Sequence, residues 1–526
     1  MKTRRLGVVA IAAIVASCGG GDGSSGGIVG GGTPVTPTLA VTLSSPSTNL
    51  VVDEGGTASF GFEANYSGSS SLPIVAVASV SGDRVTLDGG PVGTGNKFTV
   101  NLKTAPFGLG GLSSSIVTFK LCTNADCSVI YPGSTQQFAV SLDVRVKDWA
   151  NFQRNNAHTG YVAVRFDPAK FVKAWEYTDE FPAGRIRPPA ASRGLVLATV
   201  GRDGGIAYAG TMRVKALDAA TGAVRWTYDL GEQAHASGPS LANGMVHVTS
   251  MVSPSNANPQ WVLDLATGGF RNQMAFASQW SEFNQPAAEG SNAYVAAGFY
   301  GSVLYAYDTV AGTKVWETTR TGGSIWDGQS LALDATYLYY YSGSALDQVN
   351  RSTGNIVRSI AIPDYETGTR DYEAAPVLDG NANVFLFSGD KRNDGRNKII
   401  GLSLNSGSAI WQTAAEYTTA FALKDGIIYA ARQDAHVISA IDAANGAVVW
   451  STALPGSDPI VGNVIATENL LFVSSGTQTW AIDLKQSSHP VVWTAPTGGR
   501  LAITPDNYLL TTGMRDASRL TAYRLF

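Results

Sequence analysis

Ala216-Leu-Asp-Ala-Ala-Thr-Gly-Ala-Val-Arg-Trp226 is the stretch that decides the fold, because versions of it recur along most of the chain. Clear copies span residues 440–450 and 306–316, and weaker copies include 403–411 and 483–493. Successive Asp-equivalent positions are separated by 46, 44, 42, 53, 39, 41 and 41 residues. These positions are 218, 264, 308, 350, 403, 442, 483 and 524. A period of about 40 to 50 residues with strand-like flanks is typical of a β-propeller blade.

Each residue type in the phrase suits a structural role. Asp and Thr side chains can accept hydrogen bonds from the N–H groups of a tight turn, and Gly supplies a positive φ. The terminal Trp lies on an outer strand, where we expect it to pack between neighbouring blades. We therefore predict a structural docking role for thirteen residues. They are Asp218, Gly222, Trp226, Asp308, Gly312, Trp316, Trp411, Asp442, Gly446, Trp450, Asp483, Trp493 and Trp175.

The number of repeats predicts eight blades. Between copies of the phrase, short β-rich runs separated by turn residues indicate four strands per period. The eighth blade lacks an outer strand of its own, and the tryptophan-bearing run Val172–Tyr177 is the candidate to supply it. Pairing of this run with Leu520–Leu525 would close the ring and remove an exposed sheet edge.

The first 18 residues are typical of a processed export signal. Lys2, Arg4 and Arg5 precede an apolar run, Leu6–Ala16, that is too short to span a bilayer. The run ends in Val-Ala-Ser-Cys18, which resembles a bacterial lipobox and implies lipidation of Cys18. A plain secretory signal is the alternative. By analogy with sorting in enteric bacteria, Gly after the Cys predicts an outer-membrane lipoprotein, and we expect it to face the periplasm.

Two further regions precede the propeller, which we place at residues 148–526. Residues 19–38 are rich in Gly, Ser, Thr and Pro and predict a flexible linker. Residues 39–147 alternate in the manner of strands, and about 110 residues suffice for an immunoglobulin-like β-sandwich. Cys122 and Cys127 are expected to form a disulfide in an exported chain. The predicted fold class is all-β throughout.

Residues 149–161 look like the lead-in segment of quinoprotein-type (PQQ-like) eight-bladed propellers, and the repeated phrase resembles their tryptophan-docking motif. The resemblance implies this fold for about residues 148–526. Its dehydrogenase branch implies a quinone, a calcium ion, adjacent cysteines and a catalytic Asp. The mature chain's cysteines, at 18, 122 and 127, all lie outside the propeller. Its other branch contains non-catalytic BamB-type lipoproteins of outer-membrane assembly, with which this chain shares the lipobox and the blade count.

Other chemistry has little support in the sequence. A net charge of −4 with 15% charged residues disfavours nucleic-acid binding. The five histidines lack metal-ligand spacing, and residues 390–395 depart from a calcium loop because Arg392 occupies a ligand position. Neither a nucleophile-elbow motif nor a phosphate-binding glycine loop is present. We therefore expect no catalytic residue, no cofactor and no bound metal.

Partner binding is predicted on one face of the propeller. In a four-stranded antiparallel blade the phrase forms the third turn, so longer and more varied connections gather at the opposite ends of the strands. Aromatic residues and Arg are enriched in binding hot spots, and function favours loops on rigid scaffolds. The candidates are Trp280, Glu282, Phe283, Trp326, Tyr365, Arg370, Tyr372, Lys391, Arg392 and Arg396.

The leading interpretation is a non-catalytic, outer-membrane-anchored scaffold for protein–protein interaction in the bacterial envelope, with a role in outer-membrane protein assembly. Two alternatives stay open. One is a quinone- or carbohydrate-binding propeller, with or without enzymatic activity. The other is a surface-displayed, adhesin-like module.

Overall fold

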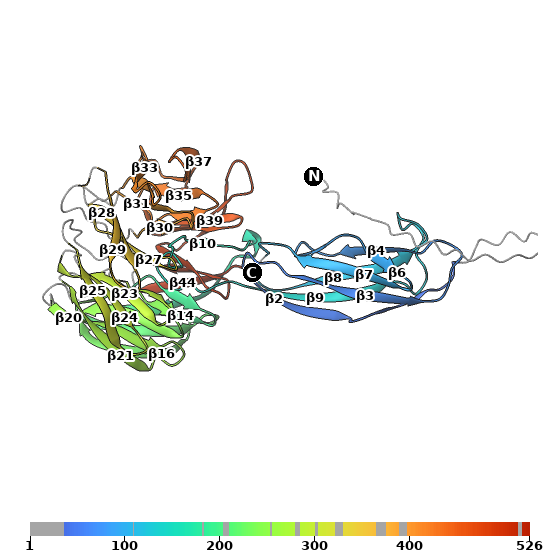
Figure 1. Ribbon diagram of the computed structural model, residues 1–526, viewed down its shortest axis with the longest axis horizontal. Helices are drawn as coiled ribbons and strands as arrows, with labels where there is room; N and C mark the ends of the chain where they lie inside the picture. The colour runs from blue at the N-terminus through green and yellow to red at the C-terminus, as the bar shows by residue number, and fades with distance from the viewer. Residues whose placement is uncertain are drawn as a thin grey trace, which may run out of the picture. The chain divides into compact units, whose positions relative to one another are not determined.

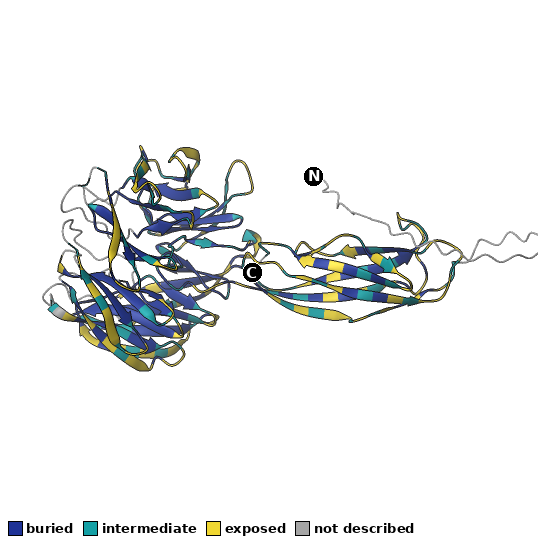
Figure 2. Ribbon diagram, in the orientation of Figure 1, coloured by how far each residue is buried: buried dark blue, intermediate teal, exposed yellow. Residues whose placement is uncertain are grey.

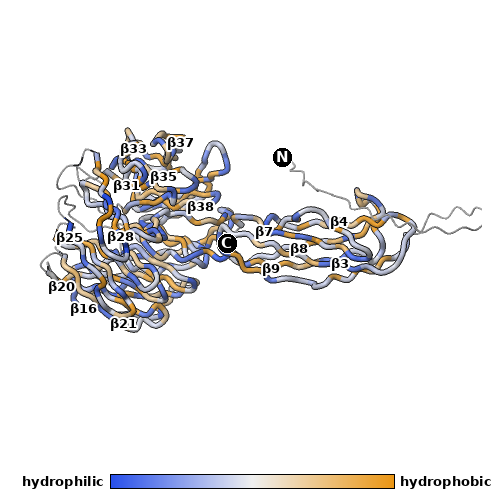
Figure 3. Tube along the Cα trace, viewed as in Figure 1, coloured by the Kyte–Doolittle hydropathy of each residue, from blue (hydrophilic) through white to orange (hydrophobic). Residues whose placement is uncertain are grey.

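The computed structural model describes residues 36–526 except 109, 181–183, 203–209, 253–254, 279–284, 300–302, 321–329, 364, 366–374, 389–396 and 514–517. The described chain is all-β, as predicted, with strands β1 to β44 and one 3₁₀ turn, η1 (Pro168–Lys170) (Figure 1). It divides into two compact units, Met1–Arg145 and Val146–Phe526. Hydrophobic residues recur along the strands of both units (Figure 3).

The first unit consists of two sheets around one core. One sheet has the order β1 (Ala40–Leu43), β3 (Ser59–Ser67), β7 (Lys97–Thr104), β5 (Val85–Leu87), with β6 (Val92–Thr94) also on β7. The other has the order β2 (Ser47–Asp53), β9 (Gln136–Arg145), β8 (Gly111–Cys122), β4 (Val75–Val80). Strand alternation turns Phe62 and Phe138 inward, where their rings stack at 4.6 Å. The predicted Cys122–Cys127 disulfide is present.

The described part of the second unit forms eight sheets, which we number in chain order. Sheets 1 to 4 contain β12 (Arg185–Ile186), β13 (Ala190–Ser192), β14 (Leu195–Arg202), β15 (Gly210–Asp218), β16 (Val224–Gln233); β17 (His235–Ala236), β18 (Ser240–Ala242), β19 (Met245–Met251), β20 (Ser255–Asp264), β21 (Phe270–Ser278); β22 (Ala287–Glu289), β23 (Asn292–Ala297), β24 (Val303–Asp308), β25 (Thr313–Thr319); and β26 (Ala332–Leu333), β27 (Tyr337–Tyr341), β28 (Ala345–Asn350), β29 (Ile356–Ala361).

Sheets 5 to 8 complete the series. They contain β30 (Val377–Leu378), β31 (Asn383–Phe387), β32 (Ile399–Ser403), β33 (Ser408–Gln412); β34 (Ala422–Lys424), β35 (Ile427–Arg432), β36 (Val437–Asp442), β37 (Val448–Ala453); β10 (Tyr161–Val162), β38 (Ile460–Thr467), β39 (Leu470–Ser475), β40 (Thr479–Asp483), β41 (Val491–Ala495); and β42 (Arg500–Ile503), β43 (Tyr508–Thr512), β44 (Arg519–Arg524), β11 (Val172–Thr178). The middle strands are buried, whereas outer strands such as β29 carry most of the exposed residues (Figure 2).

The predicted repeat matches the strands. The third antiparallel strand of every sheet ends at an Asp-equivalent position, from Asp218 in β15 to Arg524 in β44. In the first copy, Asp218 Oδ1 accepts hydrogen bonds from the N–H groups of Ala220 and Thr221 at 3.0 and 2.9 Å. Gly222 closes the turn with a φ of 72°. The phrase therefore forms a capped turn between the third and fourth strands.

Phrase tryptophans join neighbouring sheets at several seams. Trp226 Nε1 donates to the carbonyl of Leu265 at 3.1 Å, and Trp411 Nε1 donates to that of Ala443 at 2.9 Å. Trp316 makes the same bond to Arg351 at 2.8 Å. A Cβ added at Gly268 would lie 2.4 Å from the Trp226 ring, so the turn glycine also makes room for the tryptophan.

The outer strand of sheet 4, β29, carries no tryptophan, and three other seams replace part of this contact. Gly312 receives Asn272 instead of a tryptophan, and the Asn272 amide donates to the Thr309 carbonyl at 2.6 Å. Trp450 stacks on His489 with the ring centroids 3.9 Å apart. Trp493 packs edge-on against Phe171 and Tyr523. A planar side chain therefore fills each of these three seams. A seam can form without the indole N–H donor or without the turn glycine.

The last sheet is completed by a strand from the start of the unit. β11 pairs antiparallel with β44, with Val172 opposite Arg524 and Tyr177 opposite Leu520, which confirms the predicted pairing. Trp175 Nε1 donates to the Ala219 carbonyl at 2.9 Å. The same docking contact therefore links sheet 8 to sheet 1.

Candidate interaction face

The two ends of the sheets differ in the length of their connections. At the end that carries the phrase turns, connections are as short as residues 243–244 and no longer than residues 484–490. At the other end they reach residues 362–376, between β29 and β30, and residues 388–398, between β31 and β32. We call these ends the short-turn face and the long-loop face. The strand bounds thus place the long connections opposite the phrase turns.

Most residues predicted to bind a partner belong to these long connections. Tyr365 is described and partly buried after β29. The remaining candidates, the calcium-like stretch 390–395 and the lipidation site lie outside the described residues. The candidates in question are Trp280, Glu282, Phe283, Trp326, Arg370, Tyr372, Lys391, Arg392 and Arg396, together with Cys18.

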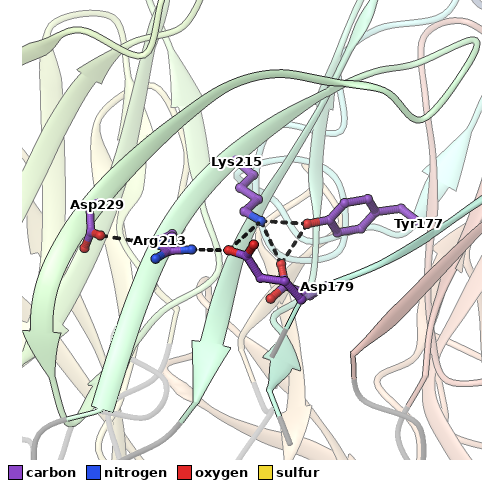
Figure 4. Close-up of polar contacts among 6 residues, drawn as sticks. Tyr177, Asp179, Arg213, Lys215 and Asp229 are labelled. Carbon is purple, nitrogen blue, oxygen red and sulfur yellow. Dashed lines mark hydrogen bonds and ion pairs between the residues drawn. The ribbon is translucent and has the colours of Figure 1, made fainter. Parts of the chain in front are cut away.

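A buried polar cluster joins the first and last sheets beside the long-loop face (Figure 4). Lys215 Nζ in β15 lies 3.0 Å from Asp179 Oδ2, just after β11, and donates to the Tyr177 hydroxyl at 2.8 Å. The Tyr177 hydroxyl donates to Asp179 at 2.7 Å. The Lys215 and Asp179 side chains are only 8% and 1% exposed. Burial and the hydrogen bond to Asp179 raise the pKa of Tyr177 above its usual value, so the phenol stays protonated and donates.

Further charges continue the cluster toward solvent. Arg213 pairs with Glu180, and Arg213 Nε lies 3.4 Å from Asp229 Oδ2 (Figure 4). Lys215 and Asp179 therefore offset each other's charge, and their contact links sheet 1 to sheet 8. Sequence reasoning missed this cluster. The available signal is that Lys215 stands between the apolar residues Val214 and Ala216 in β15.

The described histidines serve packing. Burial lowers the pKa of both His158 and His247 to about 4, so each ring is neutral at pH 7. The His436 ring nitrogens lie 3.0 and 3.1 Å from the backbone carbonyls of Leu454 and Asp458. Among the residues that the structure describes, no group of three or more His, Cys, Asp or Glu could hold a metal ion.

Within the described ranges, no helix is long and apolar enough to cross a membrane.

The sequence matches the family of the outer membrane protein assembly factor BamB over residues 158–452 and 395–504, more than half of the chain. The chain belongs to this BamB family. The matched range begins in the lead-in segment and ends in sheet 8, so the two-sheet unit lies outside it.

The crystal structure of BamB from Moraxella catarrhalis is similar to 67% of this chain and to 99% of that one, with 13% sequence identity and a TM-score of 0.49. The search of curated proteins returned no match.

Proposed function

We propose that this protein is a non-catalytic, lipid-anchored scaffold that binds protein partners in the bacterial envelope and takes part in outer-membrane protein assembly. The observation that carries the proposal is the match of residues 158–504 to the BamB family, whose name describes an assembly factor. The propeller also lacks cysteine, because Cys18, Cys122 and Cys127 all precede it. It therefore has no adjacent-cysteine disulfide of the kind expected in a quinoprotein dehydrogenase.

The architecture suits a scaffold. In this proposal the eight sheets are the blades of one closed propeller, and residues 39–147 are an immunoglobulin-like spacer. The closure contact of β11 with β44 and the docking of Trp175 on sheet 1 support a closed ring. A ring held by repeated seam contacts is a rigid support for loops of varied sequence, and binding residues are common on such loops.

The long-loop face is the proposed binding surface. On the short-turn face, the phrase residues are already engaged, with Asp218 capping its turn and Gly222 lying beneath Trp175. The long connections contribute Trp280, Trp326 and several Arg and Tyr residues. Such residues dominate hot spots because they combine large apolar area with directed hydrogen bonds.

Affinity capture from the native envelope tests this function. The full-length, tagged protein should co-purify with components of the β-barrel assembly machinery after crosslinking in intact cells. A purified protein that instead carries quinone absorbance, or that binds sugars and captures no envelope protein, would contradict the scaffold proposal.

Single substitutions locate the surface. At least one of Trp280→Ala, Trp326→Ala, Tyr372→Ala and Arg392→Ala should weaken capture about tenfold or more, the loss of a modest hot spot. Val310→Ala is the matched control, because Val310 is 64% exposed in a turn of the short-turn face. If capture is unchanged in the four variants but lost in the control, the partner binds the short-turn face and the proposal is wrong.

The anchor is tested separately. Cys18→Ala should move the protein from the membrane to the soluble periplasmic fraction without changing its melting temperature, because several acyl chains are needed for stable anchoring. A variant that stays with the membrane would refute the lipobox interpretation. Added protease should spare the wild-type protein in whole cells if it faces the periplasm, and degrade it if it is displayed on the surface.

A further inference from the structure

The lead-in segment Trp149–Tyr161, here called the strap, runs along the first strands of the sheets and ends at β10, which pairs with β38 of sheet 7. It begins four residues after Arg145, where the first unit ends. Its carbonyls accept backbone N–H groups from five sheets in chain order. The bonds are Leu241 to Ala150 (2.7 Å), Leu333 to Asn156 (2.7 Å), Leu378 to Ala157 (3.0 Å), Leu423 to Thr159 (2.8 Å) and Ala466 to Gly160 (2.9 Å).

Gln153 extends these contacts across the last three sheets. Gln153 is buried, with only 3% of the residue exposed. Gln153 Nε2 donates to the Phe421 carbonyl of sheet 6 at 2.8 Å, and Oε1 accepts from Asn463 Nδ2 of sheet 7 at 2.7 Å. Asn463 in turn exchanges two hydrogen bonds with the backbone of Leu501 in sheet 8, at 3.0 and 2.8 Å.

His158 connects sheets 4 and 5. The ring is fully buried, with Nδ1 at 2.9 Å from the Pro376 carbonyl and Nε2 at 3.4 Å from Ser330 Oγ. Burial lowers the pKa of His158 to about 4, so the neutral ring can donate to one partner and accept from the other. The strap thus spans this seam with one side chain.

The first three sheets are reached by Trp149, Asn151 and Asn156. Trp149 forms a backbone bridge to Ala191 of sheet 1. Asn151 Oδ1 accepts from Ser240 Oγ of sheet 2 at 3.2 Å. Asn156 Nδ2 donates to the Ala288 carbonyl of sheet 3 at 3.2 Å. Together with Gln153, Asn463 and His158, these bonds connect the strap to all eight sheets.

The backbone of the strap is not in its preferred conformation. Gln153, Arg154 and His158 have φ values of 46°, 81° and 56°, in the left-handed region that non-glycine residues avoid. Such residues persist only where their surroundings over-determine them. The contacts with the sheets therefore hold the strap in place, and its own local preferences oppose that geometry.

We propose that the strap is a releasable clasp: it detaches from the eight sheets as one cooperative unit and opens the short-turn end of the ring while the sheets stay folded. Leu241, Leu333, Leu378 and Leu423 lie at or beside the ends of their first strands, next to the short-turn face. Because the strap follows directly on the first unit, displacement of the preceding chain is the natural trigger for release. The inference does not depend on the identity of any partner.

Residue-resolved hydrogen exchange on the full-length protein tests the clasp. The amides of Leu241, Leu333, Leu378, Leu423 and Ala466 belong to five sheets, yet they should exchange at similar, opening-limited rates because one event frees them. Gln153→Ala should accelerate all five together about tenfold, whereas amides in the centre of β31 should keep their protection. Gln412→Ala, in the partly exposed end of outer strand β33, is the matched control and should change none of them.

Three outcomes overturn the proposal. Acceleration restricted to Leu423 and Ala466 would show that Gln153 acts only on its own neighbours. Equal acceleration of the β31 amides would show that the strap opens only with global unfolding. Unchanged exchange in both Gln153→Ala and Asn156→Ala would show that these side chains do not hold the strap.

Discussion

Replacing Trp175 by Ala removes the contact that closes the ring between sheets 8 and 1. Trp175 is only 8% exposed, its Nε1 bonds to the Ala219 carbonyl at 2.9 Å, and its ring covers Gly222. Burial of about 200 Å² at about 25 cal/mol/Å² gives an upper limit of about 5 kcal/mol. Truncation of a buried aromatic costs about 3–5 kcal/mol, which includes part of this area. The lost hydrogen bond adds about 1 kcal/mol. We expect Trp175→Ala to lower the free energy of unfolding by about 4 kcal/mol.

Urea unfolding followed by far-UV circular dichroism measures this loss, because tryptophan fluorescence would change with the substitution itself. Trp175→Phe keeps a ring over Gly222 but removes the donor, so it should lose about half as much. Trp411→Ala is the matched comparison, since Trp411 bonds to Ala443 at 2.9 Å and covers Gly446 at an internal seam.

The two Ala variants should therefore destabilise the protein by similar amounts. A loss below about 1 kcal/mol for Trp175→Ala would refute the docking account of closure. So would an intact Trp175→Ala variant beside a strongly destabilised Trp411→Ala variant, because the closing seam would then be held by other contacts.

Three further predictions concern the same ring. Deletion of residues 520–526 removes most of β44 and exposes the edges of β11 and β43, so calorimetry should show a lower and broader melting transition. A transition as sharp and as high as that of the intact protein would contradict the role of β44 in joining β11 to sheet 8. Stability should fall as pH decreases from about 7 to 4, because His158 and His247 have pKa values of about 4 when folded, below the ordinary 6.5, and the unfolded chain binds protons first. Each histidine could account for about 3 kcal/mol of this loss of stability. Two results would contradict the prediction: a free energy of unfolding of the wild type that does not depend on pH, or the same slope of stability against pH in His247→Gln as in the wild type. Asp179→Asn removes the close counter-charge of the buried Lys215 and leaves only the exposed Glu180 at 3.9 Å, so it should cost about 3 kcal/mol, most of it restored by the apolar pair Lys215→Met with Asp179→Leu. Equal urea midpoints for the wild type and the single variant would show that the pair is unimportant.

Much of the fold could be predicted from local patterns. The turn phrase depends on neighbours only a few residues apart, as when Asp218 caps the N–H of Thr221, so each copy marks the end of a third strand. Counting these marks predicted the missing fourth strand and its supply by residues 172–177. The disulfide between Cys122 and Cys127 could likewise be predicted locally, because the two cysteines are only five residues apart.

The seams could be predicted only in part. A tryptophan at the end of the phrase indicates a docking residue, but the same position is occupied by Asn272 in sheet 2, where an amide makes the corresponding bond. His489 replaces the turn glycine opposite Trp450. These exchanges are not visible in the phrase itself because the two halves of each contact come from different repeats.

What the sequence by itself determined is the repeat, the strand order within each sheet and the closing strand, because these depend on hydrogen bonding and alternation among near neighbours. Only the tertiary structure decided which buried groups meet across the seams. Lys215 and Asp179 are 36 residues apart, and Gln153 and Asn463 are 310 residues apart. Their bonds exist because the packing of neighbouring sheets brings distant parts of the chain together, and no local preference of either residue specifies that meeting.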